Sequence, residues 1–406
     1  MYDVAVVGSG AAGMMSAITA AGDGKKVLLL EKMSAVGLKL KATGGGKCNI
    51  TNTLDREEFI DSFGKQGRFM RDALSMFDSR DLVNFLEDIG LKTHAPDGFR
   101  VFPFTHDSKS VLDVLGNKMR KVGVEVRCTQ NVQHIYKKEN LFFIKTNDNT
   151  FKAKNVIVAT GGLGYSVLGS SGDGYRFAKS FGHSISELHP AMLPLHVEEK
   201  WVQNCRADTI AKATLKINLP KMKKYQKTGD LIFTKNGIRG PVVLDFATYV
   251  TPLLKTYTKV PLLVNMTKGM NEEDIRNFLS IQNHEKSNQS ILELLGKLLP
   301  KSASQELCEL AHIETDSRYA QIKAVKRDEL IKLLAWTPLS VISHDGFQKA
   351  MITKGGVKLK EIDPKTMQSK FVKGLYFCGE VVDLDGPCGG YNLQWSFSSG
   401  YLAGSL

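Results

Sequence analysis

The sequence lacks the cysteine patterns of zinc-binding and dithiol proteins. Its six cysteines are scattered over 406 residues, and no two of them form a CxxC pair. This spacing argues against a zinc site and against a redox disulfide, and it is typical of proteins from a reducing compartment. We therefore expect no bound metal and a cytoplasmic location.

Long apolar runs are also missing. No stretch approaches the roughly 20 consecutive apolar residues that cross a membrane, and Tyr2-Asp3-Val4 enters a strand-like segment with no charged leader before it. We expect neither a secretion signal nor a membrane contact. The contents of 42% hydrophobic and 24% charged residues are typical of a folded protein. The length predicts two or three domains.

Acidic residues are in deficit, which gives a formal net charge of +12. Such an excess can mark a nucleic acid or another anionic partner, but a lysine-rich surface produces it as well. The densest basic group has only Tyr225 as an aromatic neighbour, and it consists of Lys216, Lys221, Lys223, Lys224 and Lys227. Because stacking on bases needs aromatic rings, we favour the surface interpretation. We expect a small-molecule substrate and no nucleic acid partner, and nothing here indicates the oligomeric state.

What the sequence does contain is a nucleotide-binding pattern at its N-terminus. The apolar run 4–7 leads into Gly8-Ser9-Gly10-Ala11-Ala12-Gly13 and then into an Ala-rich helix. The first glycine permits a tight turn, the second lets a pyrophosphate approach the backbone, and the third lets the helix pack on the strand. The first helical residues, Ala11 and Ala12, offer N–H groups to the phosphates.

A second apolar strand, residues 27–30, ends at Glu31-Lys32. The Glu31 carboxylate stands where a ribose diol can donate hydrogen bonds to it. The order of strand, glycines, helix, strand and acid predicts a bound dinucleotide. It does not by itself distinguish NAD from FAD.

The next segment, residues 39–52, contains three successive glycines. Glycines let the backbone lie against a flat or phosphorylated ligand, and the neighbouring lysines supply positive charge. A flexible surface loop is the alternative, but polar residues suited to specific contacts bracket the glycines. The residues expected to contact the ligand here are Lys41, Gly45, Gly46 and Cys48.

The chain then returns repeatedly to the predicted sheet, which favours FAD over NAD. The strand 156–158 ends in small residues, the strand 374–378 ends in Gly379-Glu380, and a helix is predicted over 393–402. A short strand over 131–135 could place its backbone against an adenine. A long dinucleotide lying across the sheet would use all of these, with its flavin ring at the last helix. The expected contacts are Val132, Ala159, Thr160, Gly161, Gly379, Glu380, Asp385, Tyr391, Asn392 and Leu393.

Several motifs carry a resemblance that extends over nearly the whole chain. They are Thr43-Gly44-Gly45-Gly46-Lys47-Cys48-Asn49-Ile50-Thr51-Asn52, Gly98-Phe99-Arg100-Val101-Phe102-Pro103, Gly172-Asp173-Gly174-Tyr175, Thr353-Lys354-Gly355-Gly356-Val357 and the segment 386–400. With them the sequence resembles bacterial NAD(P)/FAD-dependent oxidoreductases of the aminoacetone oxidase type, a branch of the glutathione-reductase-like flavoproteins. The resemblance implies an α/β fold, in which a Rossmann-type FAD-binding domain is interrupted by a β-rich, barrel-like domain carrying a helical subdomain.

Changes in the hydrophobic pattern and charge along the sequence suggest the domain limits. Short alternating strands follow Leu193, and residues 271–329 are helical and rich in charge. We predict a discontinuous FAD-binding domain over 1–190 and 346–406. The insert spans 191–345, with its helical subdomain at about 270–330.

Flavin itself performs hydride and electron chemistry. The helix that begins near Asn392 should direct its N–H groups at the ring edge where negative charge develops, and this is the catalytic role we assign to Asn392. No second strand–GxGxxG–helix pattern is present, so NADH or NADPH would reduce the flavin transiently at its face. The leading hypothesis is an oxidoreductase acting on a small amine or enone between the FAD domain and the insert. A nucleic-acid-modifying flavoprotein and a non-enzymatic flavin-binding regulator are the alternatives.

Overall fold

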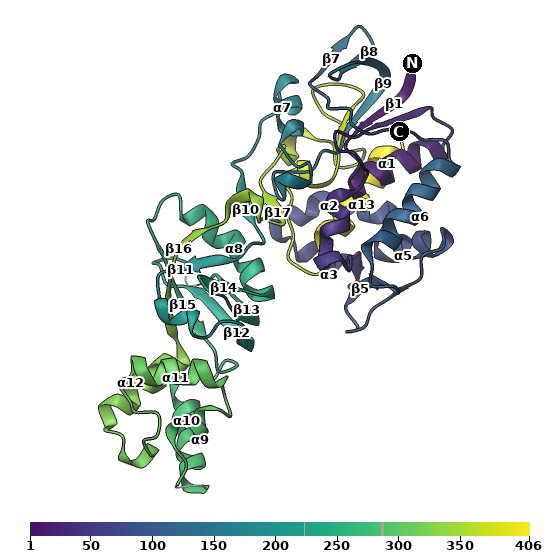
Figure 1. Cartoon of the computed structure of the whole chain (residues 1–406). Helices are drawn as coiled ribbons and strands as arrows, with labels where there is room; N and C mark the ends of the chain where they lie inside the picture. Colours follow the sequence, from purple (N-terminus) through teal and green to yellow (C-terminus); the bar gives the residue numbers. More distant parts are fainter. Residues whose placement is uncertain (223, 286–287) are drawn as a thin grey trace. The chain divides into compact units, whose positions relative to one another are not determined.

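The computed structural model describes residues 1–222, 224–285 and 288–406, which divide into two compact units (Figure 1). The first unit comprises Met1–His189 and Met351–Leu406, and the second comprises Pro190–Ala350. The predicted fold class is confirmed: a Rossmann-type α/β unit is interrupted by a unit built on a closed β-barrel with helices. One member of the predicted lysine group, Lys223, lies outside the described residues.

A seven-stranded sheet forms the centre of the first unit. Its order is β6-β2-β1-β9-β8-β7, and β18 also pairs with β9. The strands are β1 (Tyr2–Val7), β2 (Val27–Leu30), β6 (Glu125–Arg127), β7 (His134–Lys138), β8 (Leu141–Lys145), β9 (Thr150–Val158) and β18 (Leu375–Phe377). The central strands are parallel and buried on both faces, which explains their continuous apolar sequences.

Strand register determines where the site residues lie. Val7 is paired with Leu30 on one side and with Val158 on the other, and Val158 is paired with Phe377. All four strands are parallel here, so their carboxyl ends meet at one edge of the sheet. In open α/β sheets ligands bind at this edge.

Helices surround this sheet (Figure 1). They are α1 (Ala11–Gly22), α2 (Leu38–Ala42), α3 (Arg56–Asp61), α4 (Arg71–Met76), α5 (Ser79–Asp88), α6 (Ser108–Lys121), α7 (Asp173–Ser180) and α13 (Tyr391–Gly404). The 3-10 helices are η1 (Thr43–Gly46), η2 (Gly64–Met70), η3 (Ser166–Leu168), η7 (Leu359–Glu361) and η8 (Gly379–Val381). A small sheet is formed by β3 (Thr51–Asn52), β5 (Arg100–Pro103) and β4 (Thr93–His94).

The first and last helices of the chain pack backbone to backbone. A Cβ atom on Gly400 of α13 would lie 2.4 Å from the carbonyl oxygen of Ala12 in α1. A residue without a side chain at position 400 is therefore required by the contact of the last helix with α1. This contact ties the C-terminus to the glycine-rich turn at the N-terminus.

The second unit contains a closed barrel of order β11-β14-β13-β12-β15-β16. Its strands are β11 (Leu195–Val197), β12 (Thr209–Ile217), β13 (Gln226–Phe233), β14 (Gly237–Arg239), β15 (Val260–Asn265) and β16 (Thr337–His344). Its helices are α8 (Pro241–Leu253), α9 (Glu272–Glu285), α10 (Ile291–Leu295), α11 (Lys301–Leu310), α12 (Ala324–Ala335), η4 (Lys200–Gln203), η5 (Tyr319–Gln321) and η6 (Gly346–Gln348). The chain leaves the first unit at β10 (His189–Ala191) and re-enters it before β17 (Ile352–Lys354).

Two element limits differ from the sequence prediction. Val132 precedes β7, which begins at His134, so the predicted strand over 131–135 starts too early. The last helix begins at Tyr391, two residues before the predicted start. Among the described residues, no helix is long and apolar enough to cross a membrane.

Candidate functional site

The turn after β1 has the three-glycine construction that the sequence predicts. Gly8 has φ of +99°, and a Cβ on Gly13 would lie 1.9 Å from the Gly8 carbonyl oxygen. These two glycines are therefore needed by the protein itself. Gly10, the N-cap of α1, differs, because a Cβ there would meet no atom within 4 Å. The space before the amides of Ala11 and Ala12 is open, as a phosphate-binding turn requires.

Glu31 lies beside this turn, at the end of β2. Its carboxylate accepts hydrogen bonds from Ser9 N (3.0 Å), Ser9 Oγ (2.5 Å) and Met33 N (2.9 Å). A carboxylate has about four acceptor positions, so one remains for a ribose hydroxyl. Glu31 thus links the two strand ends and can still bind a ligand.

We predict that Glu31→Ala weakens FAD binding by about 1.5–3 kcal/mol, the range for a hydrogen bond to a charged group. The variant should also unfold at a lower temperature, because the buried Ser9 amide loses its acceptor. Titration of apo-protein with FAD measures the first effect. Glu31→Gln keeps the size of the side chain and one acceptor oxygen, so its affinity for FAD should fall between those of wild type and Glu31→Ala. Equal affinities for all three proteins would remove Glu31 from the site.

A second cluster joins the ends of β9 and β18. Glu380 accepts a hydrogen bond from Thr353 N (2.9 Å) and pairs with Lys39 (2.6 Å). Thr353 Oγ1 in turn accepts from Leu163 N at 2.7 Å. A Cβ on Gly162 would lie 2.6 Å from Glu380 Oε1. Sequence reasoning assigned Glu380 to the site, named Thr353 only within a motif and gave Lys39 no role.

Other predicted residues lie near this cluster at the sheet edge. Ala159 follows β9, and its N–H donates to Val7 O (2.9 Å). Thr160 Oγ1 is buried without a hydrogen-bond partner among the described residues. Gly161 has φ of +68°, and Gly379 has φ of +75° at the start of η8. These small residues keep the edge free of bulky side chains.

The glycine-rich loop 43–52 meets the N-terminus of α13, far away in sequence. Asn52 Nδ2 donates to Gly389 O (3.0 Å). A Cβ on Gly390, the N-cap of α13, would lie 2.4 Å from the backbone of Thr51. The loop itself needs its glycines, because Gly45 and Gly46 have φ of +65° and +91°. A Cβ on either would meet nothing within 4 Å, which leaves space beside them.

The first residues of α13 divide their roles between packing and positioning. The Tyr391 ring lies 5.0 Å from that of Phe59. Asn392 clamps the preceding turn, since its Oδ1 accepts from Gly386 N (2.8 Å) and its Nδ2 donates to Gly386 O (2.8 Å). Leu393 is half-buried, as is Asp385 before the helix. The Asn392 side chain therefore positions the start of α13, while the helix offers main-chain N–H groups.

The remaining predicted residues occupy varied environments. Lys32 pairs with Asp173 (2.9 Å), which belongs to the Gly172–Tyr175 motif. The Lys41 side chain is exposed, and Val132 is buried. Burial raises the pKa of the Cys48 thiol to about 11, although a hydrogen bond with Thr43 opposes this. Cys48 is therefore protonated at neutral pH and fills space.

The arrangement fits FAD. The open space at Gly10 lies where a pyrophosphate is expected, and a second open space lies at Gly45 and Gly46, in the loop whose Thr51 and Asn52 meet the start of α13. The unpartnered Thr160 hydroxyl lies at the same sheet edge. Acceptors for a ribose and main-chain donors for phosphates are thus provided by separate segments. Glu31 and Gly10 would hold the adenosine end, and the α13 N-terminus would hold the flavin end.

This assignment predicts an effect on reduction potential. Leu393→Asp places a carboxylate in the first turn of α13, where it stabilises the helix but disfavours added negative charge on a nearby flavin. A charge at a helix end contributes about 0.3–2 kcal/mol. If the carboxylate destabilises the reduced flavin by this amount, the midpoint potential of bound FAD should fall by roughly 6–40 mV for the two-electron couple. Leu393→Asn is the neutral control. Spectroscopic redox titration that gives equal potentials for both variants would place α13 away from the flavin.

Comparison with known proteins adds independent information. The sequence profile of the HI0933-like protein Rossmann domain matches residues 2–406. The chain is 31% identical over 409 residues to the 3-dehydro-bile acid delta(4,6)-reductase of Clostridium scindens, covering 100% of this chain and 98% of the relative. It is 28% identical over 401 residues to the ribosomal RNA dihydrouridine synthase of Escherichia coli, covering 98% and 96%.

Solved structures support the fold. The 3-ketosteroid delta1-dehydrogenase from Sterolibacterium denitrificans, in complex with 1,4-androstadiene-3,17-dione, aligns with a TM-score of 0.54. The alignment covers 99% of this chain and 98% of that protein at 12% identity. At this identity the likeness concerns the architecture alone.

Proposed function

Since the chain is a flavin-dependent oxidoreductase that belongs to the family of HI0933-like Rossmann-domain proteins, we propose that it reduces a carbon–carbon double bond conjugated to a carbonyl group. The substrate we propose is a small organic molecule. The observation that carries this proposal is the whole-length similarity to two enzymes with different substrates but related chemistry. In a 3-dehydro bile acid with 4,6 double bonds, the double bonds are conjugated to the 3-carbonyl. In uridine, the bond that dihydrouridine lacks is conjugated to a ring carbonyl.

The chemistry suits the site. A double bond conjugated to a carbonyl is electron-poor at its far carbon, so it accepts a hydride there and a proton, available from solvent, at the carbon next to the carbonyl. The hydride is what a bound reduced flavin would supply. The protein's task is then to bind and orient rather than to provide a nucleophile. For the cofactor, the main-chain N–H groups at the start of α1 and at the start of α13 would perform this task, and Asn392 would position the latter.

The reductant we propose is NADH or NADPH, bound transiently at the flavin face. The glycine-rich turn after β1 is followed by a helix, a second strand and Glu31. The other glycine-rich stretches, 161–174 and 355–356, do not have that order of elements in the sequence. A nicotinamide cofactor would therefore have to bind without a second dinucleotide-binding fold, in transient contact with the flavin face.

An anaerobic half-reaction tests the proposal. Enzyme reduced with one equivalent of dithionite is mixed with an enone panel, including a 3-oxo-4-ene steroid and cyclohexenone, and with the matching saturated ketones. We expect at least one enone, and no saturated ketone, to restore the spectrum of oxidised flavin and to gain two hydrogens by mass spectrometry. If air reoxidises the enzyme rapidly and no enone does, an oxidase of the aminoacetone type is favoured instead.

A uracil within RNA is a second candidate substrate. The net charge of +12 favours it, as does the similarity to a ribosomal RNA dihydrouridine synthase. The structure adds an aromatic neighbour that sequence reasoning missed, because Lys216 Nζ lies 3.6 Å from the centroid of the Trp336 ring. Incubation of reduced enzyme with ribosomal RNA, followed by nucleoside mass spectrometry, tests this candidate. No dihydrouridine above the oxidised-enzyme control would reject it.

A further inference from the structure

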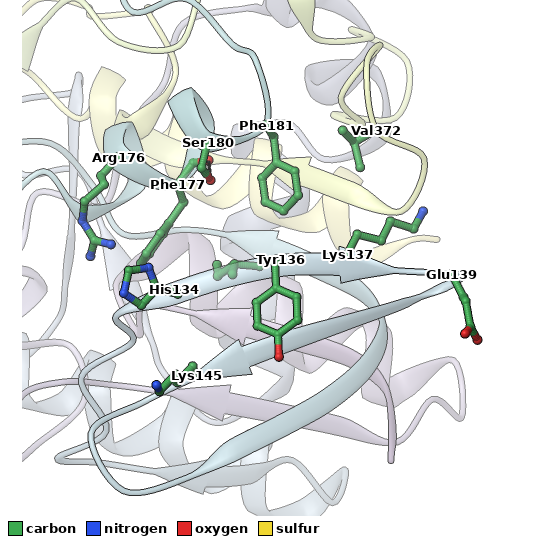
Figure 2. A pocket seen from close by; sticks show the side chains of 11 residues that line it. His134, Tyr136, Lys137, Glu139, Lys145, Arg176, Phe177, Ser180, Phe181 and Val372 are labelled. Carbon is green, nitrogen blue, oxygen red and sulfur yellow. Dashed lines mark hydrogen bonds between the residues drawn. The ribbon is translucent and has the colours of Figure 1, made fainter.

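The sheet of the first unit has a solvent-exposed face where β7, β8 and β9 lie side by side. Buried and outward-facing side chains alternate along these strands, as in a sheet that is covered on one face. The covered face carries Ile135 and Phe142, and the Phe181 ring at the end of α7 lies 6.0 Å from that of Phe142. Figure 2 shows Phe181 and Tyr136 on opposite sides of β7. Helix α7 therefore covers the face that points away from Tyr136.

A row of stacked groups crosses the exposed face. Tyr136, Phe143 and Lys152 are directly paired from β7 to β8 and from β8 to β9. The two rings are stacked, with centroids 5.2 Å and planes 3° apart, and Lys152 Nζ lies 5.1 Å from the Phe143 centroid. Phe143 is thus flanked by a ring and a cation. Tyr136 ends the row on the edge strand and is 47% exposed, so its outer side can stack with a further flat group.

Cationic groups lie on both sides of this row. Lys145 is paired with His134 two residues before Tyr136, and Lys138 lies two residues after it. The three side chains are exposed, and within the described parts of the chain no hydrogen bond or ion pair engages them. Alternate residues of a strand are roughly 6.6 Å apart. A lysine ammonium is therefore available on each side of the tyrosine ring along the strand direction.

The outward-facing positions of the three strands carry no acidic residue. In chain order they are His134, Tyr136, Lys138, Leu141, Phe143, Lys145, Thr150, Lys152 and Lys154. Glu139 and Asp148 belong to the turns between the strands, and Asp3 of the adjoining β1 is paired with Lys154 at 2.8 Å. An anionic chain can thus lie across these strands without meeting an unpaired carboxylate on them.

We propose that the outward face of β7, β8 and β9 binds single-stranded RNA, with a base stacked on Tyr136 and phosphates at Lys138 and Lys145. Surfaces that bind single strands combine aromatic rings, on which bases stack, with cations that follow the backbone. Unpaired bases are the usual state of RNA loops and ends, which favours RNA over DNA as the occupant. The face uses none of the residues assigned to FAD, and the proposal does not rest on the proposed substrate.

Two structural roles account for part of this surface. Lysines on an edge strand discourage pairing with another chain, which explains Lys138 but not Lys145 and Lys152, because β8 and β9 are interior strands. Cross-strand aromatic pairs stabilise sheets, which explains why Phe143 faces Tyr136. If the pair were only structural, replacing Tyr136 by another apolar residue would change stability and leave RNA binding unchanged.

Fluorescence anisotropy of a short labelled oligouridylate, titrated with holoenzyme, tests the stacking contact. Saturating FAD keeps the oligomer out of the dinucleotide site. Tyr136→Leu should weaken binding by about five-fold or more, the lower end for one base on one ring, and Tyr136→Phe should bind as wild type. An RNA duplex of the same length should bind about five-fold more weakly than the single strand or worse, because its bases are paired and cannot stack on the ring.

Salt dependence tests the two lysines. Each phosphate contact with a single strand contributes about 0.7 to the slope of log K against log salt concentration, so Lys138→Ala/Lys145→Ala should make the slope shallower by about 1.4. Lys92→Ala/Lys121→Ala removes the same charge from exposed positions of the first unit outside this face, and it should leave the slope unchanged. Both double variants should keep full FAD, because these side chains are exposed.

Three results would overturn the proposal. The first is that the oligouridylate does not bind, and the second is that the duplex binds as tightly as the single strand. The third is that either Tyr136→Leu or Lys138→Ala/Lys145→Ala binds the single strand as wild type does, which would place any bound RNA on another surface, such as the lysine group around Lys216. The readout is binding and not reduction of a substrate, so failure here leaves the proposed enzymatic function untouched.

Discussion

Purified Gly10→Glu protein should be folded and colourless. Gly10 has φ of −69°, which any residue adopts, and its Cβ would meet no atom within 4 Å. The protein itself therefore tolerates a side chain here, and a carboxylate next to a helix N-terminus is even mildly stabilising. The same carboxylate fills the space expected for the pyrophosphate and repels it. FAD should be lost while the fold is kept.

The other end of α1 provides a matched control. Gly22 closes the helix, and its Cβ would also meet nothing within 4 Å. Gly22→Glu adds the same charge to the same helix, and it should leave the protein yellow. Flavin absorbance per protein, together with circular dichroism, measures both properties. Full flavin content in Gly10→Glu would refute the assignment of the α1 N-terminus to the phosphates.

The residues at the ligand-binding edge of the sheet were predictable because the sequence patterns that indicate them are local. Each strand that delivers a site residue is a short apolar run ending in glycine, a small residue or an acid, as at Val7, Leu30 and Val158. In parallel strands such ends meet at one edge, so the sequence was enough to bring Gly8, Glu31 and Ala159 together.

The long-range contacts between short elements at the site were not predictable. Lys39 reaches Glu380, and Asn52 reaches Gly389, across more than 300 residues of sequence. Such pairs depend on where the packing of other elements places two short segments, and neither segment carries a period or spacing in its sequence that indicates the contact. The early start predicted for the strand containing Val132 has a related cause. The chain there crosses from the end of β6 to β7, where Gln130 N donates to Glu31 O (2.8 Å), and an apolar residue inside such a crossing resembles the first residue of a strand.

Substituting Gly13, the third glycine of the turn after β1, should have the opposite effect to substituting Gly10, the second. It should lower the stability of the fold itself. Gly13 lies inside α1, where alanine would normally stabilise a helix by up to about 1 kcal/mol. Here its Cβ would lie 1.9 Å from Gly8 O and 3.3 Å from the Ala159 Cβ. No side-chain rotation relieves a clash with a backbone oxygen, so α1 must move away from the sheet.

We therefore expect Gly13→Ala to destabilise the first unit by about 3 kcal/mol, at the upper end for overpacking. For a domain of this size that lowers the melting temperature by roughly 6–12 °C. Apo-protein should be measured, so that flavin loss does not contribute. Gly116→Ala is the control, because Gly116 lies within α6 and its Cβ would meet nothing within 4 Å. It should raise the melting temperature slightly. If Gly13→Ala also melts at or above the wild-type temperature, α1 does not pack on the turn after β1 as closely as the structure places it, and the loss of flavin in Gly10→Glu would then need a different cause.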